Sequence, residues 1–154
     1  MPTDTSTACA RKPTVIALDS NIFIYFLAAH PEFGEDAREL LVAIEQTSLN
    51  ACASELVHYE VLSCSGVSDA DAHDITQLLG EVDVTYKPVS REVLHSAAKL
   101  RCDYGCGAMD SIHLASALQA KATHFVTNDK AVLKKPVEGI ELVALEQARG
   151  LYEL

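Results

Sequence analysis

The sequence lacks tryptophan, and only 6% of its residues are aromatic. It also lacks a long hydrophobic run, because the longest, Ile22 to Ala29, is less than half of the roughly 20 residues that a membrane span requires. No charged segment leads into an apolar one near the N-terminus, so we expect no targeting signal. These absences predict a soluble, cytoplasmic protein that does not act at a membrane.

Cysteines are few and do not form the pattern of a secreted protein. Their number is five, which is odd, and their spacing does not match a disulfide framework, so we expect reduced thiols. Cys102 and Cys106 stand close enough in sequence to share a zinc ion. However, no second pair of Cys or His residues lies nearby at ligand spacing, and a structural zinc site usually needs four ligands.

An excess of positive charge is also missing. The formal net charge is −10 at pH 7, which is opposite to that of a general nucleic-acid binder, because contacts to phosphate dominate that kind of affinity. A nucleic acid would therefore have to be bound by a local field. Bound metal ions can invert the local field of an acidic site.

The chain has 154 residues, of which 49% are apolar, and this suffices for one hydrophobic core. It contains no internal repeat, low-complexity segment or linker. We therefore predict a flexible N-terminal tail at residues 1–13 and a single domain at residues 14–154.

Short apolar runs alternate with helical patterns along the whole chain, which predicts an α/β fold. We expect a three-layer α/β/α sandwich around a mostly parallel sheet. The predicted strands are residues 14–18, 49–53, 82–86, 124–127 and 140–144. Two helices are predicted in the first part of the chain, one directly after Asp19 and one from Gly34. Two more begin at N-caps, one running from Ser54 to about Cys64 and one from Ser68 to a stop at Gly80. The last two run from Ser90 to a break at Gly105 and over residues 109–122.

Four acidic residues occupy positions that suggest a common site. Asp19 and Asp129 each follow a predicted strand, and in parallel sheets ligands bind beyond the carboxyl ends of the strands. Glu60 lies inside a predicted helix, and Asp110 opens a buried one. Taken singly, each has a structural explanation as a helix cap worth about 1 kcal/mol, a turn residue or a solvated charge. Their joint placement favours convergence.

Converging carboxylates predict a metal site. Two carboxylates about 4 Å apart repel by about 1 kcal/mol in water, and by several times more where they are partly buried. Cations relieve this repulsion, and a set of oxygen ligands selects Mg²⁺ or Mn²⁺ over zinc. Such ions suit phosphodiester cleavage, because one activates a water molecule and a second stabilises the leaving oxygen.

The four segments ALDSNIFIY, SELVHYEVL, GAMDSIHLASAL and THFVTNDKAVL resemble, in order and spacing, the four acidic segments of PIN-domain ribonucleases. The similarity is greatest to the VapC-like toxins of bacterial toxin–antitoxin pairs, and it extends over residues 14–145. The resemblance implies an endoribonuclease that depends on Mg²⁺ or Mn²⁺ and uses a metal-activated water. It also implies a homodimer and a small antitoxin protein that blocks the site.

Residue by residue, the resemblance assigns metal binding to Asp19, Glu60, Asp110 and Asp129. Asn21 and Thr127 match the polar residues that hold those acids and waters in place. One departure concerns Tyr59 and His113, which are bulkier and more polar than the residues that many family members have there. Candidate contacts to RNA phosphates are the basic residues that flank the third and fourth segments: Arg91, Lys99, Arg101, Lys130, Lys134 and Lys135.

Other interpretations remain open at this point. The same fold also fits a PIN nuclease of RNA maturation or decay that has no antitoxin. A phosphotransfer enzyme with Asp19 as nucleophile would need a second aspartate two residues later, where this chain has Asn21. A catalytically silent interaction domain would not bind metal. The histidines at 58, 113 and 124 match partly buried structural histidines more simply than general bases, and the basic residues match a solvated helix face equally well.

Overall fold

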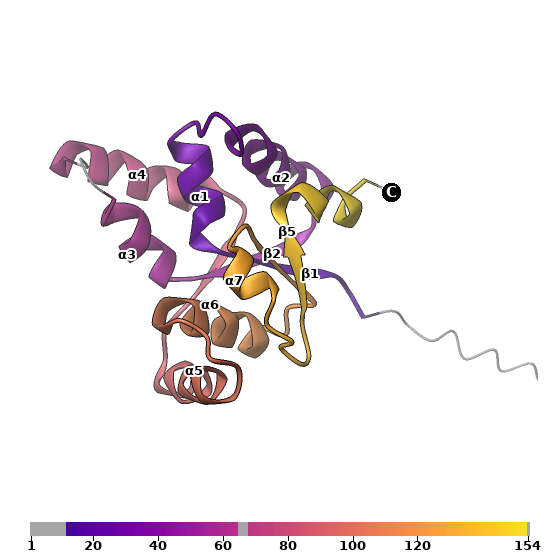
Figure 1. Ribbon diagram of the computed structural model, residues 1–154. Coiled ribbons are helices and arrows are strands. Elements are labelled where there is room, and N and C mark those ends of the chain that lie inside the picture. Colours follow the sequence, from indigo (N-terminus) through magenta and orange to yellow (C-terminus); the bar gives the residue numbers. More distant parts are fainter. Residues whose placement is uncertain (1–11, 65–67, 154) are drawn as a thin grey trace, which may run out of the picture.

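The computed structural model describes residues 12–64 and 68–153 and contains a five-stranded sheet in the order β3-β2-β1-β4-β5 (Figure 1). Every neighbouring pair is parallel, which confirms the predicted sheet. The strands are β1 (Val15–Leu18), β2 (Asn50–Ser54), β3 (Thr85–Lys87), β4 (His124–Thr127) and β5 (Glu141–Ala144). Of the predicted N-terminal tail, residues 1–11 lie outside the described residues, and Lys12 and Pro13 belong to no helix or strand.

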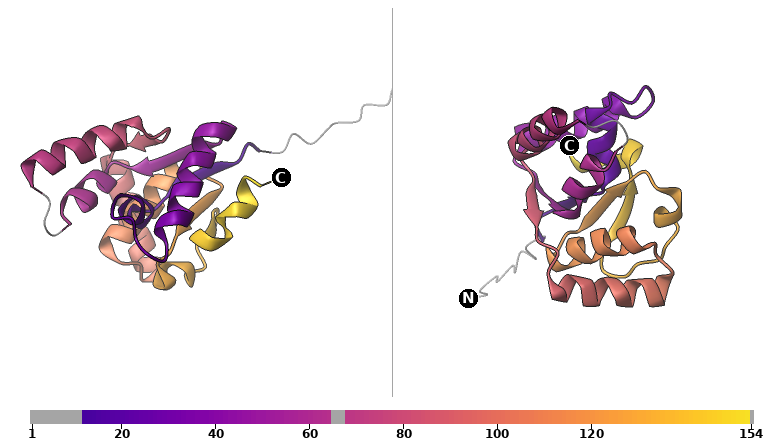
Figure 2. Two further views of the ribbon diagram at one scale, coloured as in Figure 1. Left: turned by 90° about the horizontal axis from the view of Figure 1, so that it is seen from above. Right: turned by 90° about the vertical axis from the view of Figure 1, so that its left-hand side faces the viewer.

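Helices cover both faces of the sheet, as the predicted three-layer sandwich requires (Figures 1 and 2). One face packs against the helices of the first half of the chain and the C-terminal turn, and the other packs against the helices of the second half. The first group is α1 (Ser20–Leu27), α2 (Gly34–Thr47), α3 (Leu56–Leu62), α4 (Asp69–Glu81) and the 3₁₀ helix η1 (Leu145–Leu151); the second is α5 (Arg91–Tyr104), α6 (Ala108–Gln119) and α7 (Lys130–Leu133). No helix within the described residues is long and apolar enough to cross a membrane.

The central strand shows why both faces are apolar. In β1, Ile16 and Leu18 point to the core beneath α1 and α2, whereas Ala17 points to the core beneath α6. Side chains of a strand alternate between faces, so a strand between two helical layers is apolar at every position. This explains why the continuous run before Asp19 identified the strand from sequence alone.

The strand order creates a switch point beside β1. After β1 the chain builds β2 and β3 on one side, and it then returns to β4 and β5 on the other side. The connections to β2 and β3 lie on one face, and the connection to β4 through α5 and α6 lies on the opposite face. In such sheets a crevice opens at the carboxyl ends of the strands at the switch point. Here that position is the end of β1 and β4.

Three predicted boundaries were wrong. Ser54 is the last residue of β2 and α3 begins at Leu56, although the Ser54 hydroxyl does accept a bond from the Leu56 N–H at 3.2 Å. Gly80 does not stop α4, because helical hydrogen bonding continues to Glu81. The third strand begins at Thr85, since the preceding residues, from Val82, form a turn with two partly or fully buried apolar side chains.

Other boundaries shifted less, and two short elements were not predicted. The helix expected over residues 109–122 is α6, which ends at Gln119 because Lys121 adopts a left-handed conformation with φ of 56°. The helices α7 and η1 have four and seven residues, too few to give a clear hydrophobic period. The N-cap predicted at Ser68 is confirmed, and Ser90, where a helix was predicted to begin, is also an N-cap; each accepts a hydrogen bond from the N–H three residues later.

Candidate active site

Asp19 lies at the centre of the crevice, directly after β1 and before α1. Its side chain is buried, with 4% of the residue exposed, and both carboxylate oxygens accept hydrogen bonds. Oδ1 accepts from the Ser20 N–H at 2.7 Å, and Oδ2 accepts from the Thr127 hydroxyl at 2.6 Å. Burial raises the pKa of Asp19, and this outweighs the lowering by His113, Thr127 and the Ser20 N–H. The carboxylate is therefore fixed from the start of α1 and from the end of β4 at once.

Thr127, the last residue of β4, organises the polar groups around Asp19. Its hydroxyl donates to Asp19 and accepts from Asn21 Nδ2 at 3.2 Å and from the Asp129 N–H at 3.1 Å. A hydroxyl has one proton, so the bond to Asn21 must come from the amide nitrogen. Consequently Asn21 Oδ1 is the free end of that amide. It is buried without a hydrogen-bond partner in the described part of the chain.

Glu60 reaches the same centre from α3. Its Oε1 lies 2.5 Å from His113 Nε2, and its Oε2 accepts from the Ser20 hydroxyl at 2.6 Å. The same His113 nitrogen is 3.9 Å from Asp19 Oδ1. Burial alone would raise the pKa of Glu60, but the bonds from His113 and Ser20 lower it on balance. For His113, burial favours the neutral ring, yet the bond to Glu60 and the charges of Asp19 and Glu60 raise its pKa overall.

Asp110 stands in the first turn of α6, beside the other carboxylates. Burial raises its pKa most, and the negative charges of Asp19, Asp129 and Glu60 raise it further. A Cβ atom on Gly107 would lie 2.9 Å from Asp110 Oδ2, so a larger residue there would displace the Asp110 carboxylate. The repulsion between Asp110 and the other three carboxylates indicates that all four predicted acids lie close enough to interact electrostatically.

Asp129 begins α7 and has a structural task as well. Its Oδ1 accepts from the Ala131 N–H at 2.8 Å and from the Val132 N–H at 3.4 Å, so it is a helix N-cap. The structural alternative considered for Asp129 from sequence was a turn residue beside Asn128, whereas the structure makes it a helix N-cap. A cap uses only one carboxylate oxygen here, and no described hydrogen bond uses Oδ2.

The site fits a hard divalent cation by the chemistry of its donors. Four carboxylates and the amide oxygen of Asn21 are oxygen ligands of the kind that Mg²⁺ and Mn²⁺ prefer. Within residues 12–64 and 68–153, no three His, Cys, Asp or Glu side chains are already placed to hold a metal ion. Both oxygens of Asp19 and both of Glu60 accept hydrogen bonds from protein donors. Binding would exchange some of these bonds for metal contacts.

The basic candidates fall into separate places. Lys135 lies near the site: its Nζ would be 3.6 Å from a Cβ on Gly105, and its charge lowers the Cys106 pKa, which burial and the charge of Asp110 raise. Lys130 is on α7 beside Asp129, and Lys134 follows the same helix. Lys99 forms an exposed ion pair with Asp103. Arg101 lies in the last turn of α5, whereas Arg91 begins α5, next to the end of α6 that is remote from Asp110.

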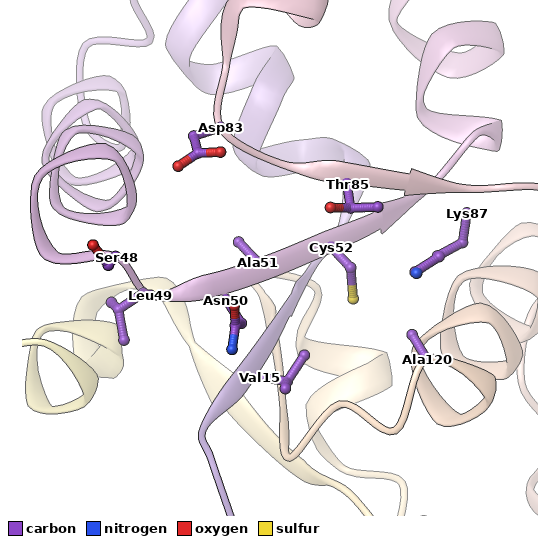
Figure 3. Close-up of a pocket in the computed structure, with 10 residues that line it drawn as sticks. All are labelled: Val15, Ser48, Leu49, Asn50, Ala51, Cys52, Asp83, Thr85, Lys87 and Ala120. Atoms are coloured by element: carbon purple, nitrogen blue, oxygen red, sulfur yellow. The ribbon is translucent and has the colours of Figure 1, made fainter.

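A pocket of about 410 Å³ lies near the amino ends of β1 and β2, opposite to the ends that carry the acids (Figure 3). It is lined by the first residues of β1 and β2, including Val15 and Asn50, and by Cys52, Asp83 and Lys87. None of the four acids lines this pocket. The carboxylates at the carboxyl ends of the strands are therefore separate from this pocket.

Sequence reasoning assigned no role in the site to Ser20, and it placed His113 near the site but favoured a structural histidine over a general base. A signal for His113 was present, since it follows Asp110 by three residues and so lies on the same side of a helix. Tyr59, the other departure from the family pattern, is 60% exposed next to Glu60 in sequence.

Comparisons with known proteins agree with this geometry. A family model described as PIN domain matches residues 16–137. A toxin–antitoxin complex from Klebsiella pneumoniae is similar in fold, with a TM-score of 0.65, 16% identity, and coverage of 84% of this chain and 97% of that one. VapBC2 from Rickettsia felis, bound to a DNA fragment from its promoter, has a TM-score of 0.64 and 17% identity, and the match covers 85% of this chain and 98% of that one. PAE2754 from Pyrobaculum aerophilum has a TM-score of 0.57 and 17% identity, and the match covers 99% of each chain. No curated protein matches by sequence.

Proposed function

The chain belongs to the PIN-domain family, a family of nucleases, and we propose that it is a metal-dependent endoribonuclease that hydrolyses RNA phosphodiester bonds. The observation that carries this proposal is the convergence of four carboxylates at the switch point, where Asp110 experiences the charges of Asp19, Asp129 and Glu60. Such a cluster is costly without a cation. It is suited to holding Mg²⁺ or Mn²⁺ against the phosphate of a substrate.

In this mechanism Asp19, Glu60, Asp110 and Asp129 hold the metal. The bound ion supplies an activated water and stabilises charge on the leaving oxygen. Thr127 keeps Asp19 oriented through its 2.6 Å hydrogen bond. Asn21 presents a buried amide oxygen to the same region, where it can accept a hydrogen bond from a water molecule.

The RNA backbone approaches along the positive side chains nearest the site. Lys130, Lys134 and Lys135 follow Asp129 in the chain, and Lys135 also lies beside the segment that leads to Asp110. These cations offset the overall net charge of −10 locally, which a phosphate backbone requires. Arg101, Lys99 and Arg91 are progressively farther back along α5, so we assign them the weaker contacts.

The physiological role proposed is that of the toxin in a type II toxin–antitoxin pair. Two proteins of similar fold are described as parts of such systems: the toxin–antitoxin complex from Klebsiella pneumoniae and VapBC2 from Rickettsia felis. The role implies a cytoplasmic homodimer and a small antitoxin that covers the site. If no adjacent antitoxin gene exists and no partner inhibits the chain, the assignment becomes a PIN nuclease of RNA processing or decay.

The test is incubation of the purified chain with mixed RNA, with Mn²⁺ and with EDTA, beside the variants Asp19→Asn and Asp103→Asn. Asp103 is a matched control, because it is an aspartate that only pairs with Lys99 on the exposed side of α5. We expect metal-dependent fragments from the wild type and from Asp103→Asn, and loss of cleavage in Asp19→Asn. Cleavage that persists in EDTA, or that Asp19→Asn retains, contradicts the proposal.

A further inference from the structure

His113, which the family resemblance already placed near the site, makes a contact with Glu60 that the sequence did not predict. It is three residues after Asp110 on α6, and only 2% of it is exposed. Its Nε2 atom is 2.5 Å from Glu60 Oε1 and 3.9 Å from Asp19 Oδ1. The imidazole therefore points towards the carboxylates of Glu60 and Asp19.

The other ring nitrogen defines the direction of the hydrogen bond to Glu60. Nδ1 of His113 is buried and has no partner among the described residues. A buried N–H without an acceptor is costly, so the neutral ring carries its proton on Nε2. His113 is thus the donor, and Glu60 Oε1 is the acceptor.

Glu60 needs such a donor more than the other acids do. Asp19 and Asp129 are short side chains fixed by the N–H groups of adjacent helices, whereas Glu60 is a longer side chain on the seven-residue helix α3. An unrestrained glutamate loses rotamer freedom when it is ordered, and this loss opposes metal binding. His113 and Ser20 hold one carboxylate oxygen each, so the side chain is already ordered towards the centre.

We propose that His113 is a positioning residue that holds Glu60 as a ligand of the metal site through the bond from Nε2 to Oε1. This inference rests on the proposed metal-dependent function. In this role Glu60 keeps its bond to His113 and turns its other oxygen, now bonded to Ser20, to the cation. Hydrogen-bond partners of metal ligands typically contribute 10- to 100-fold in metal affinity.

The experiment measures Mn²⁺ affinity by calorimetry or by electron paramagnetic resonance, without RNA. We expect His113→Leu to weaken Mn²⁺ binding about 10- to 100-fold, and His113→Gln, which retains an N–H donor, to recover most of it. His113→Asn, a smaller polar side chain whose donor is withdrawn from Glu60, replaces the leucine variant if that one does not fold. Leu114→Ala is the control for core damage, because Leu114 is fully buried beside His113 on α6.

Leu114→Ala is expected to lower the melting temperature and leave Mn²⁺ affinity unchanged. In a Glu60→Gln background, removal of the His113 donor should produce little further loss, since the histidine acts through Glu60. Unchanged or tighter Mn²⁺ binding in a folded variant without the donor overturns the proposal for His113, as does additivity with Glu60→Gln. The proposed function fails separately, if the wild type itself binds no Mn²⁺ or cleaves no RNA.

Discussion

The hydroxyl of Thr127 donates a 2.6 Å hydrogen bond to Asp19 Oδ2, across 108 positions in the sequence. This bond joins the ends of β4 and β1, which are neighbours at the switch point of the sheet. The oxygen of the same hydroxyl accepts hydrogen bonds from the Asn21 amide and from the Asp129 N–H. One side chain therefore orients groups from two of the four acidic segments, the one that holds Asp19 and Asn21 and the one that holds Asp129.

Asp19→Asn and Asp110→Asn should each reduce RNA cleavage by at least about 100-fold, because each removes one metal-binding carboxylate without creating a cavity. Both variants are expected to remain folded. Single-turnover cleavage rates in Mn²⁺ buffer, with circular dichroism as the folding check, provide the measurement. A near-normal rate in either variant would remove that residue from the set of four.

In the metal-free protein, the contribution of Asp110 to the stability of the fold should change with pH. Burial and neighbouring acids raise the Asp110 pKa above its ordinary value of 3.8. The folded state therefore binds a proton more tightly than the unfolded state, and stability falls as pH rises from 3.8 through the raised pKa. At neutral pH, Asp110→Asn should be as stable as the wild type in EDTA, or slightly more stable.

Urea unfolding of the two proteins in EDTA, followed from pH 4 to pH 7, tests this sign. The difference in unfolding free energy should move in favour of Asp110→Asn as pH increases. A difference that moves in favour of the wild type would mean that Asp110 is stabilised in its charged form.

Mn²⁺ should raise the thermal stability of the wild type. A ligand that binds only the native state adds about 2.7 kcal/mol at a hundredfold excess over Kd. The gain should diminish as pH falls, because protonated carboxylates do not coordinate metal. Melting curves in Mn²⁺ and in EDTA, for the wild type and Asp110→Asn, supply the comparison. Equal shifts in both proteins would place the metal elsewhere.

Thr127→Val should lower both stability and activity, whereas Thr127→Ser should retain most of each. Valine keeps the shape but leaves Asp19 Oδ2, the Asn21 amide and the Asp129 N–H without their shared partner. A buried polar group left unpaired costs about 1–3 kcal/mol, so a loss of at least that size is expected from urea unfolding. A valine variant as stable and active as the wild type would show that the hydroxyl contributes little, and a serine variant as impaired as valine would show that the methyl group matters as well.

An inhibitory partner should place an Arg or Lys side chain among the carboxylates. Arginine is the better candidate, because its planar guanidinium can pair with two carboxylate oxygens at once. Replacing the basic residues of the cognate partner one at a time should identify one substitution that weakens inhibition and affinity. If every substitution leaves both unchanged, the partner blocks the site by apolar occlusion.

Local sequence patterns determined the strands and the four acids. The run before Asp19 is apolar at consecutive positions because β1 lies between two helical layers, and such a run needs no knowledge of its neighbours to be recognised. The alternation of strands and helices then predicted the parallel sheet, and strand ends located Asp19 and Asp129 at its carboxyl edge. Their function was supported further by the order of all four acidic segments.

Tertiary structure alone decided how these residues connect. His113 donates to Glu60 across 53 positions, and nothing in the periodicity of α6 distinguishes a buried histidine that orders a ligand from one that fills the core. The assignment of the Asn21 oxygen as the free atom depends on the single proton of Thr127. The separation of Arg91 from Lys135 depends on the direction of α5. Sequence periodicity records which side of an element is buried, whereas a contact between distant elements depends on how they pack, and that is set by the whole fold.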